Sequence, residues 1–289
     1  MKAVVPGPSS LLEDLERLVP GASRRTLRQM LAQGRVSVNG EIRRLAAHPL
    51  SPGDTIEIGG RTAPSILPRG LEILHEDDAL LVIRKPTGLL TVATLHEKER
   101  TAYAYLRAYV KAREPRRRLY IVHRLDKFAS GILVFAKSEP VQSALQEIFS
   151  RHDIERKYWA IVEGSVKQNQ GTIRSRLVQD RSLRMHSTED ATRGKEAITH
   201  YRVLGRLREL TVLEVTLETG RKNQIRAHLS EMGHPIAGDR AYGSTRDPLK
   251  RLGLHAFRLG FRHPVTGEPV RFETGPPPEF VRYLPARQA

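Results

Sequence analysis

One aspartate stands out among the residues that could do chemistry, because it lies between basic side chains just before an apolar segment. Residues 123–131 read HRLDKFASG, and the next residues, ILVFAK, have the apolar character of a buried strand. A carboxylate at the mouth of such a strand belongs either to a solvated turn or to a working site. We therefore consider Asp126 the first candidate for a catalytic residue.

Several familiar reaction types are excluded by what the chain lacks. The sequence has no cysteine, which rules out disulfides, thiol catalysis and thiolate zinc sites. It contains neither a glycine-rich phosphate loop ending in Lys-Ser/Thr nor a Gly-x-Ser-x-Gly motif. No two histidines are four residues apart, so we expect no metal site. Of the other carboxylates near basic residues, Asp239 is assigned to a turn and the pair Asp77-Asp78 to a strand connection.

The charge balance favours a polyanionic partner. Lys and Arg number 48 against 32 Asp and Glu, which gives a net charge of +16 over 289 residues. Such a charge attracts nucleic acid, although a generally basic surface explains the charge alone about equally well. The chain starts with no signal peptide or anchor and has no apolar run long enough for a membrane helix, so we expect no membrane association and a reducing, cytoplasmic setting.

A small basic domain is expected at the N-terminus, over residues 9–60. Ser23 is a plausible N-cap for a helix with Leu27, Met30 and Leu31 on one face, and Gly34 should end it. RVSVNG then reads as a strand closing on the turn dipeptide Asn39-Gly40, and LSPGDTIEI reads as a turn and a strand. The exposed helix face would present Arg24, Arg25 and Arg28, and Arg35 follows just beyond the helix end. This basic surface either contacts RNA or is simply solvated.

A second, larger domain is expected after a proline-containing linker. RTAPSILPRG forms that linker over residues 61–70, and the domain covers residues 71–289. Its strand and helix patterns do not alternate regularly, so a mixed, mainly antiparallel sheet is favoured over a doubly wound one. The predicted fold class is therefore α+β, with a helix-and-hairpin domain preceding the larger one.

Two resemblances cover nearly the whole chain. Residues 9–60 resemble the small RNA-binding domain named after ribosomal protein S-four, in helix, GRVSVNG turn and PGD turn. HRLDKFASGILVFAKS resembles the central motif of the RluA-type pseudouridine synthases. Three further blocks follow in that family's order: KYWAIVEG, GRKNQIRAHLSEMGHPIAGDRAYG and LHAFRLGFRHPVTGE. The block LEILHEDDALLVIRKPTGLLT precedes the central motif. Each block alone is weak evidence, but five in order are strong.

The resemblance implies roles for three catalytic residues. Asp126 would act on the uridine as nucleophile or as base, and the residues leave these alternatives open. Tyr158 would stack on the uracil and take part in proton transfer at C5, although a core tyrosine is the default for such a strand position. Arg226 would pair with Asp126 and keep it ionised, where a helix-surface arginine is the ordinary interpretation.

Residues for RNA entry also follow from the resemblance. Arg124 would fill the space left by a flipped base, His123 would support the loop, and Ile225 would pack near the base. The family usually has Thr at the position of Ala129 and His at that of Asn223, so positioning or substrate choice can differ here.

The resemblance therefore implies an isomerase that converts uridines in RNA to pseudouridine without a cofactor. Large-subunit ribosomal RNA is the expected substrate and partner, and transfer RNA is the alternative. A non-catalytic RNA-binding or ribosome-assembly factor is a second class, although such a protein has no need of Asp126, Tyr158 and Arg226 together. We expect a monomer.

Overall fold

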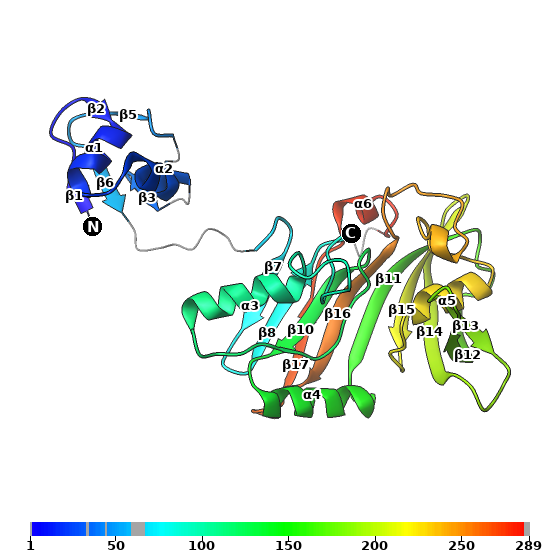
Figure 1. Cartoon of the computed structure of the whole chain (residues 1–289). Coiled ribbons are helices and arrows are strands. Elements are labelled where there is room, and N and C mark those ends of the chain that lie inside the picture. Colours follow the sequence, from blue (N-terminus) through cyan, green and yellow to red (C-terminus); the bar gives the residue numbers. More distant parts are fainter. Residues whose placement is uncertain (1, 33–34, 44, 59–66, 286–289) are drawn as a thin grey trace. The chain divides into compact units, whose positions relative to one another are not determined.

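The computed structural model describes residues 2–32, 35–43, 45–58 and 67–285 (Figure 1). They form two compact units, residues 1–66 and 67–289, and each unit has a hydrophobic core of its own. Most of the linker expected over residues 61–70, and Gly34, lie outside the described residues. None of the helices in the described part of the chain is both long and apolar enough to cross a membrane.

The N-terminal unit consists of two short helices and two small antiparallel sheets. The helices are α1 (Leu11–Leu18) and α2 (Arg24–Ala32). A four-stranded sheet has the order β1 (Lys2–Val4), β6 (Thr55–Ile58), β3 (Val36–Val38) and β4 (Glu41–Ile42). The second sheet pairs β2 (Ser9–Ser10) with β5 (Pro49–Leu50).

Local signals in the sequence explain where these elements begin and end. Helix α2 starts after Ser23, whose Oγ accepts a hydrogen bond from the Thr26 amide at 3.2 Å, as an N-cap does. Its face with Leu27 is buried, as the helical spacing predicts. The turn between β3 and β4 has positive φ at Asn39 and Gly40, which this hairpin turn requires. The expected helix and hairpin are confirmed.

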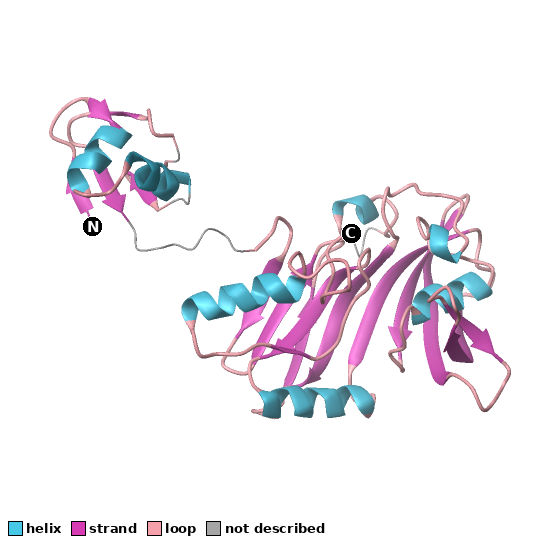
Figure 2. Cartoon of the chain, viewed as in Figure 1, coloured by secondary structure: helices cyan, strands magenta, loops and turns pink. Residues whose placement is uncertain are grey.

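The larger unit is built on one mixed sheet of eleven strands, drawn in magenta in Figure 2. Its main order is β13 (Met185–Thr188), β12 (Gln170–Gln179), β14 (Lys195–Arg206), β15 (Leu210–Leu217), β11 (Glu155–Glu163), β16 (Leu254–Arg262), β10 (Ser130–Ala136), β8 (Leu80–Lys85) and β7 (Glu72–Glu76). In addition, β17 (Pro269–Glu273) pairs with β16, and β9 (Tyr120–Ile121) pairs with β10. The pairing of β10 with β16 is parallel and the others are antiparallel, which confirms the predicted α+β class.

Helices cover both faces of this sheet. They are α3 (Ala102–Arg113), α4 (Glu139–Ser150), α5 (Gln224–Glu231), the 3-10 turn η1 (Arg240–Tyr242) and α6 (Pro278–Val281). Alternate residues of β10 point to opposite faces. Leu133 and Phe135 pack in the cluster with α3 and α5, whereas Ile132 and Val134 pack with α4. Strand β10 is thus buried on both sides, and it provides a rigid base for the loop that precedes it.

Candidate active site

The three residues expected to carry the chemistry line one cavity of about 570 Å³. Asp126 comes from the loop before β10, Tyr158 from β11 and Arg226 from α5. The Asp126 side chain is 25% exposed, so it is open to the cavity but mostly shielded. The same wall contains five more residues named from the sequence: His123, Arg124, Ala129, Asn223 and Ile225.

Close strand packing brings Asp126 and Tyr158 to the same place. Gly131 of β10 pairs with Ala256 of β16, and Ala256 pairs in turn with Tyr158 of β11. A Cβ on Gly131, which has φ +121°, would lie 2.1 Å from the Ala256 carbonyl oxygen, so no larger residue fits. The register of β11 on β16 also shifts between Lys157 and Tyr158, and such a bulge re-aims the side chain.

Tyr158 presents a neutral phenol to the cavity. Its side chain is buried, and its hydroxyl has no hydrogen-bond partner among the described residues. Burial raises the pKa of Tyr158; the Arg156 charge opposes this shift and the Asp126 charge adds to it. The phenol therefore keeps its proton at neutral pH and has its hydroxyl free for a bound molecule.

Arg226 stands between two carboxylates. Its Nε and Nη2 donate to Asp239 at 2.7 and 2.8 Å in a bidentate pair, and its Nη1 approaches Asp126 Oδ2 at 3.5 Å. Burial acts to lower the pKa of Arg226, but the hydrogen bonds and charge of Asp239, together with Asp126, raise it. The guanidinium is thus held by Asp239 and directed at Asp126.

Asp239 is therefore more than the turn residue assigned from the sequence. It does precede η1, but its side chain is only 2% exposed and its carboxylate is used entirely by Arg226. Asn223 adds a third contact, since its Oδ1 accepts from Arg226 Nη1 at 3.1 Å and its Nδ2 donates to the Tyr242 hydroxyl at 3.2 Å. The residue that departs from the family pattern thus helps to orient the arginine.

A buried lysine that the sequence reasoning missed supports the Asp126 loop. Lys85 is fully buried, and its Nζ lies 2.6 Å from the carbonyl oxygen of Ala129 and 3.2 Å from that of Lys127. It also reaches the carbonyls of Pro86 and Leu89 at 3.0 and 2.7 Å. Burial lowers the pKa of Lys85 to about 7, against an upward contribution from the Asp126 charge. The lysine ties the two loops together beneath the carboxylate.

His123 and Arg124 occupy different positions beside Asp126. The His123 Nε2 accepts from the Val134 amide at 3.2 Å and its ring lies 4.7 Å from that of Phe149, so the imidazole fixes the loop to β10. Burial lowers the pKa of His123 to about 3, and the Arg156 charge adds to the shift, which leaves the acceptor nitrogen unprotonated. Arg124 is exposed at the cavity and has no partner among the described residues.

Comparison with known proteins shows to which protein family the chain belongs. The family model for RNA pseudouridylate synthase matches residues 79–231, and that of the S4 domain matches residues 15–56. The chain belongs to the RNA pseudouridylate synthase family. It is accordingly an RNA pseudouridine synthase, an isomerase with an S4 domain before its catalytic unit.

The sequence similarity to relatives extends over most of this chain and most of theirs. A chain of Neisseria meningitidis serogroup A named ribosomal large subunit pseudouridine synthase D is 35% identical over 93% of this chain and 76% of its own. A Bacillus subtilis chain named as the uncharacterized RNA pseudouridine synthase YlyB is 37% identical over 91% and 88%. Among solved structures, the human RNA pseudouridylate synthase domain containing 4 superposes with a TM-score of 0.61 at 27% identity, covering 73% of this chain and 90% of that one.

The four arginines expected on one surface belong to the S4 domain. Arg24, Arg25 and Arg28 are exposed on α2, but Arg24 pairs with Glu16 at 2.6 Å. Arg25 and Arg28 have no partner among the described residues, and Arg35 is partly buried beyond the helix. Of the four cations expected on one surface, two are thus free for phosphate.

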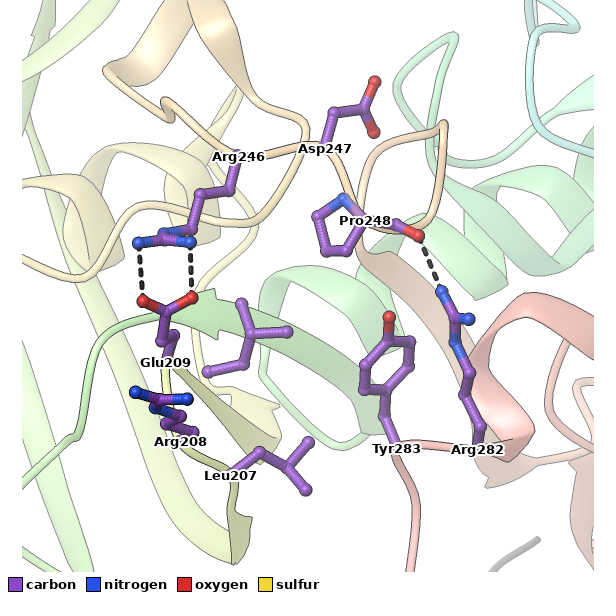
Figure 3. Close-up of a pocket in the computed structure, with 9 residues that line it drawn as sticks. Leu207, Arg208, Glu209, Arg246, Asp247, Pro248, Arg282 and Tyr283 are labelled. Atoms are coloured by element: carbon purple, nitrogen blue, oxygen red, sulfur yellow. Dashed lines mark hydrogen bonds and ion pairs between the residues drawn. The ribbon is translucent and has the colours of Figure 1, made fainter.

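Figure 3 shows a second cavity of the pseudouridine synthase, which has a volume of about 680 Å³. Its lining includes Tyr283 and the bidentate pair of Arg246 with Glu209. It shares no described lining residue with the Asp126 cavity. Among the described residues no group of three or more His, Asp or Glu side chains could hold a metal ion.

Proposed function

We propose that this pseudouridine synthase modifies large-subunit ribosomal RNA and that Asp126 starts the reaction. The observation that supports the catalytic role is the cavity in which Asp126, Tyr158 and Arg226 meet. The ribosomal substrate is supported by the names of relatives that cover most of this chain. Such a substrate implies action in the cytoplasm, and we propose a monomer because one chain supplies the cavity wall.

The reaction exchanges one bond of the uridine for another. The bond from ribose C1′ to N1 breaks, the uracil turns, and a bond from C1′ to C5 forms, while C5 loses a proton and N1 gains one. Asp126 begins this exchange either by attacking C1′ or by removing a proton from the ribose, and both routes need the ionised carboxylate. The Arg226 guanidinium lies 3.5 Å from the Asp126 carboxylate and supplies the opposite charge beside it. Atoms balance without a redox step, so we propose that no cofactor takes part.

Tyr158 and Ile225 are proposed to hold the uracil while it turns. Both are buried, and both line the cavity, so an aromatic ring and an aliphatic side chain are available to the base. A paired uridine would not reach this cavity, so the nucleotide must be flipped out. Arg124, exposed and unpaired with any described residue, is proposed to fill the space that the base leaves.

Replacing Tyr158 by Phe should slow product formation while leaving RNA affinity nearly unchanged. The ring that stacks is kept, but the hydroxyl available for proton transfer at C5 is lost, which should cost about a hundredfold or more in rate. Single-turnover assays with transcribed ribosomal RNA measure the rate, and filter binding measures the affinity. Wild-type turnover would leave stacking as the only role of Tyr158. Tyr283→Phe, at the separate cavity of Figure 3, is the matched control.

Replacing Arg25 and Arg28 together by Ala should weaken RNA binding and flatten its salt dependence. Each free cation that meets a phosphate releases counterions, so the slope of log affinity against log salt should fall by roughly 1.5. Lys2→Ala is the control in the same unit, because Lys2 is already paired with Glu57 at 2.7 Å. Turnover on a short RNA should not change. If the double variant has the same salt slope as wild type, α2 does not contribute to RNA binding.

The substrate itself is tested by mapping pseudouridine in total RNA from cells with and without this gene. Loss at discrete uridines of large-subunit ribosomal RNA is the expected result. Loss confined to transfer RNA would replace the ribosomal substrate by the alternative one.

A further inference from the structure

An aromatic side chain next to the catalytic aspartate is left in solvent. Phe128 is 56% exposed, although it lies only two residues after Asp126. It does not line the cavity that contains Asp126, so its ring lies outside that cavity. Single exposed apolar residues are ordinary on protein surfaces, so exposure alone gives Phe128 no role. What distinguishes Phe128 is how its backbone is held and what surrounds its ring.

The turn that carries Phe128 is fixed from below. The carbonyl oxygen of Phe128 accepts from Thr87 Oγ1 at 2.7 Å, and the carbonyls on either side, of Lys127 and Ala129, accept from Lys85 Nζ. Three successive carbonyls are therefore bound to residues 85 and 87. These hydrogen bonds fix the backbone at residue 128, so its Cα–Cβ bond keeps the direction in which the ring is exposed.

The surroundings of the ring are cationic. The Lys127 ammonium lies 5.2 Å from the ring centroid, and Lys127 forms no ion pair within the described part of the chain. Arg124, four residues before Phe128 in the same loop, has no ion pair there either. A hydrophobic protein segment would gain little from unpaired charges in this loop. An aromatic face with a free lysine over it, in a loop that also carries an unpaired arginine, instead suits a nucleobase with its phosphate groups.

We propose that Phe128 is a stacking platform for an unpaired base of the RNA next to the target uridine. The inference rests on the proposed function, since it needs a uridine flipped into the Asp126 cavity. Two residues of chain span at most about 7 Å, so only a nucleotide close to the target reaches both sites. Phe128 touches the RNA but no reacting atom, and it therefore affects binding and target choice rather than the chemical step.

Affinity measurements test the platform. Phe128→Ala should bind transcribed large-subunit ribosomal RNA about 5- to 150-fold more weakly, the range for loss of one base–aromatic stack. Phe128→Tyr should bind like wild type, while Phe128→Leu, which is apolar but not aromatic, should be weakened nearly as much as Phe128→Ala. Val265→Ala is the control, because Val265 is 67% exposed and lies beyond the far end of β16. Binding by Phe128→Ala within twofold of wild type would overturn the platform.

A fluorescence readout tests stacking without any chemistry. Phe128→Trp adds an exposed indole to a chain whose one native tryptophan, Trp159, is buried. A mixed-sequence single-stranded RNA of twelve nucleotides should quench this variant at low salt and leave wild-type fluorescence nearly unchanged. If the RNA quenches the fluorescence of Phe128→Trp no more than that of wild type, the proposal is wrong, whatever the activity assay gives.

The two proposals fail in different ways. Quenching and weakened binding, with no pseudouridine made by wild type in ribosomal or transfer RNA, would support the platform and contradict the proposed function. Normal pseudouridine formation with unchanged affinity in Phe128→Ala would support the function and contradict the platform.

Discussion

Asp126→Asn is expected to make no detectable pseudouridine while it binds RNA as tightly as wild type or more tightly. The amide is nearly isosteric with the carboxylate, but it is a poor nucleophile and not a base, so both routes from Asp126 are closed. Loss of a catalytic group of this kind lowers the rate by a factor on the order of ten thousand or more. Removing a negative charge beside an RNA backbone should not weaken binding. Nucleoside analysis after incubation with transcribed ribosomal RNA measures the product, and filter binding measures the affinity.

A matched control separates this effect from a general loss of charge. Asp78→Asn removes one carboxylate from a fully exposed position in the same unit, where Arg117, at 3.4 Å, is its one side-chain partner among the residues that the structure describes. It should retain wild-type turnover. Appreciable turnover in Asp126→Asn would show that another group starts the reaction, and an unfolded variant would be recognised by its thermal denaturation.

Asp239→Asn should also lower the rate strongly, through the arginine rather than through the substrate. The substitution removes the charge that pairs with Arg226 and leaves at most one of the two acceptors suited to the guanidinium. Arg226 then has Asp126 as its remaining carboxylate partner and can shift toward it. A displacement of about 1 Å at a reacting centre costs about a hundredfold in rate, and we expect a fall of that order in kcat with a small change in KM.

A conservative variant distinguishes positioning from a merely structural role. The loss in Asp239→Asn should fall on kcat rather than on KM, and Asp239→Glu, which restores a carboxylate for Arg226, should recover part of it. Glu209→Gln is the control, since Glu209 makes a bidentate pair with Arg246 at the other cavity (Figure 3). Normal turnover in Asp239→Asn would contradict the proposed orientation of Arg226.

Much of the architecture was predictable because it depends on short-range patterns. The N-cap at Ser23, the Asn39-Gly40 turn and the buried strand after Gly131 are local in sequence, and each is found where the pattern placed it. The irregular order of strands and helices also sufficed for the fold class. The pairing of β10 with β16 could not be predicted in this way, because it joins residues 130 and 255.

The sequence by itself determined the candidates for chemistry, while the tertiary structure decided how they are held. Asp126 was recognisable because a carboxylate before an apolar strand is unusual, and Tyr158 and Arg226 followed from motif resemblance. The buried supports carry no such local mark. Lys85 meets the Asp126 loop across 44 residues, and Arg226 lies 100 residues from Asp126. A lysine at the end of a strand and an aspartate in a turn look like solvated residues until folding removes water from them. Once buried, each of these side chains needs a partner from a distant part of the chain, because an unpaired buried charge is costly.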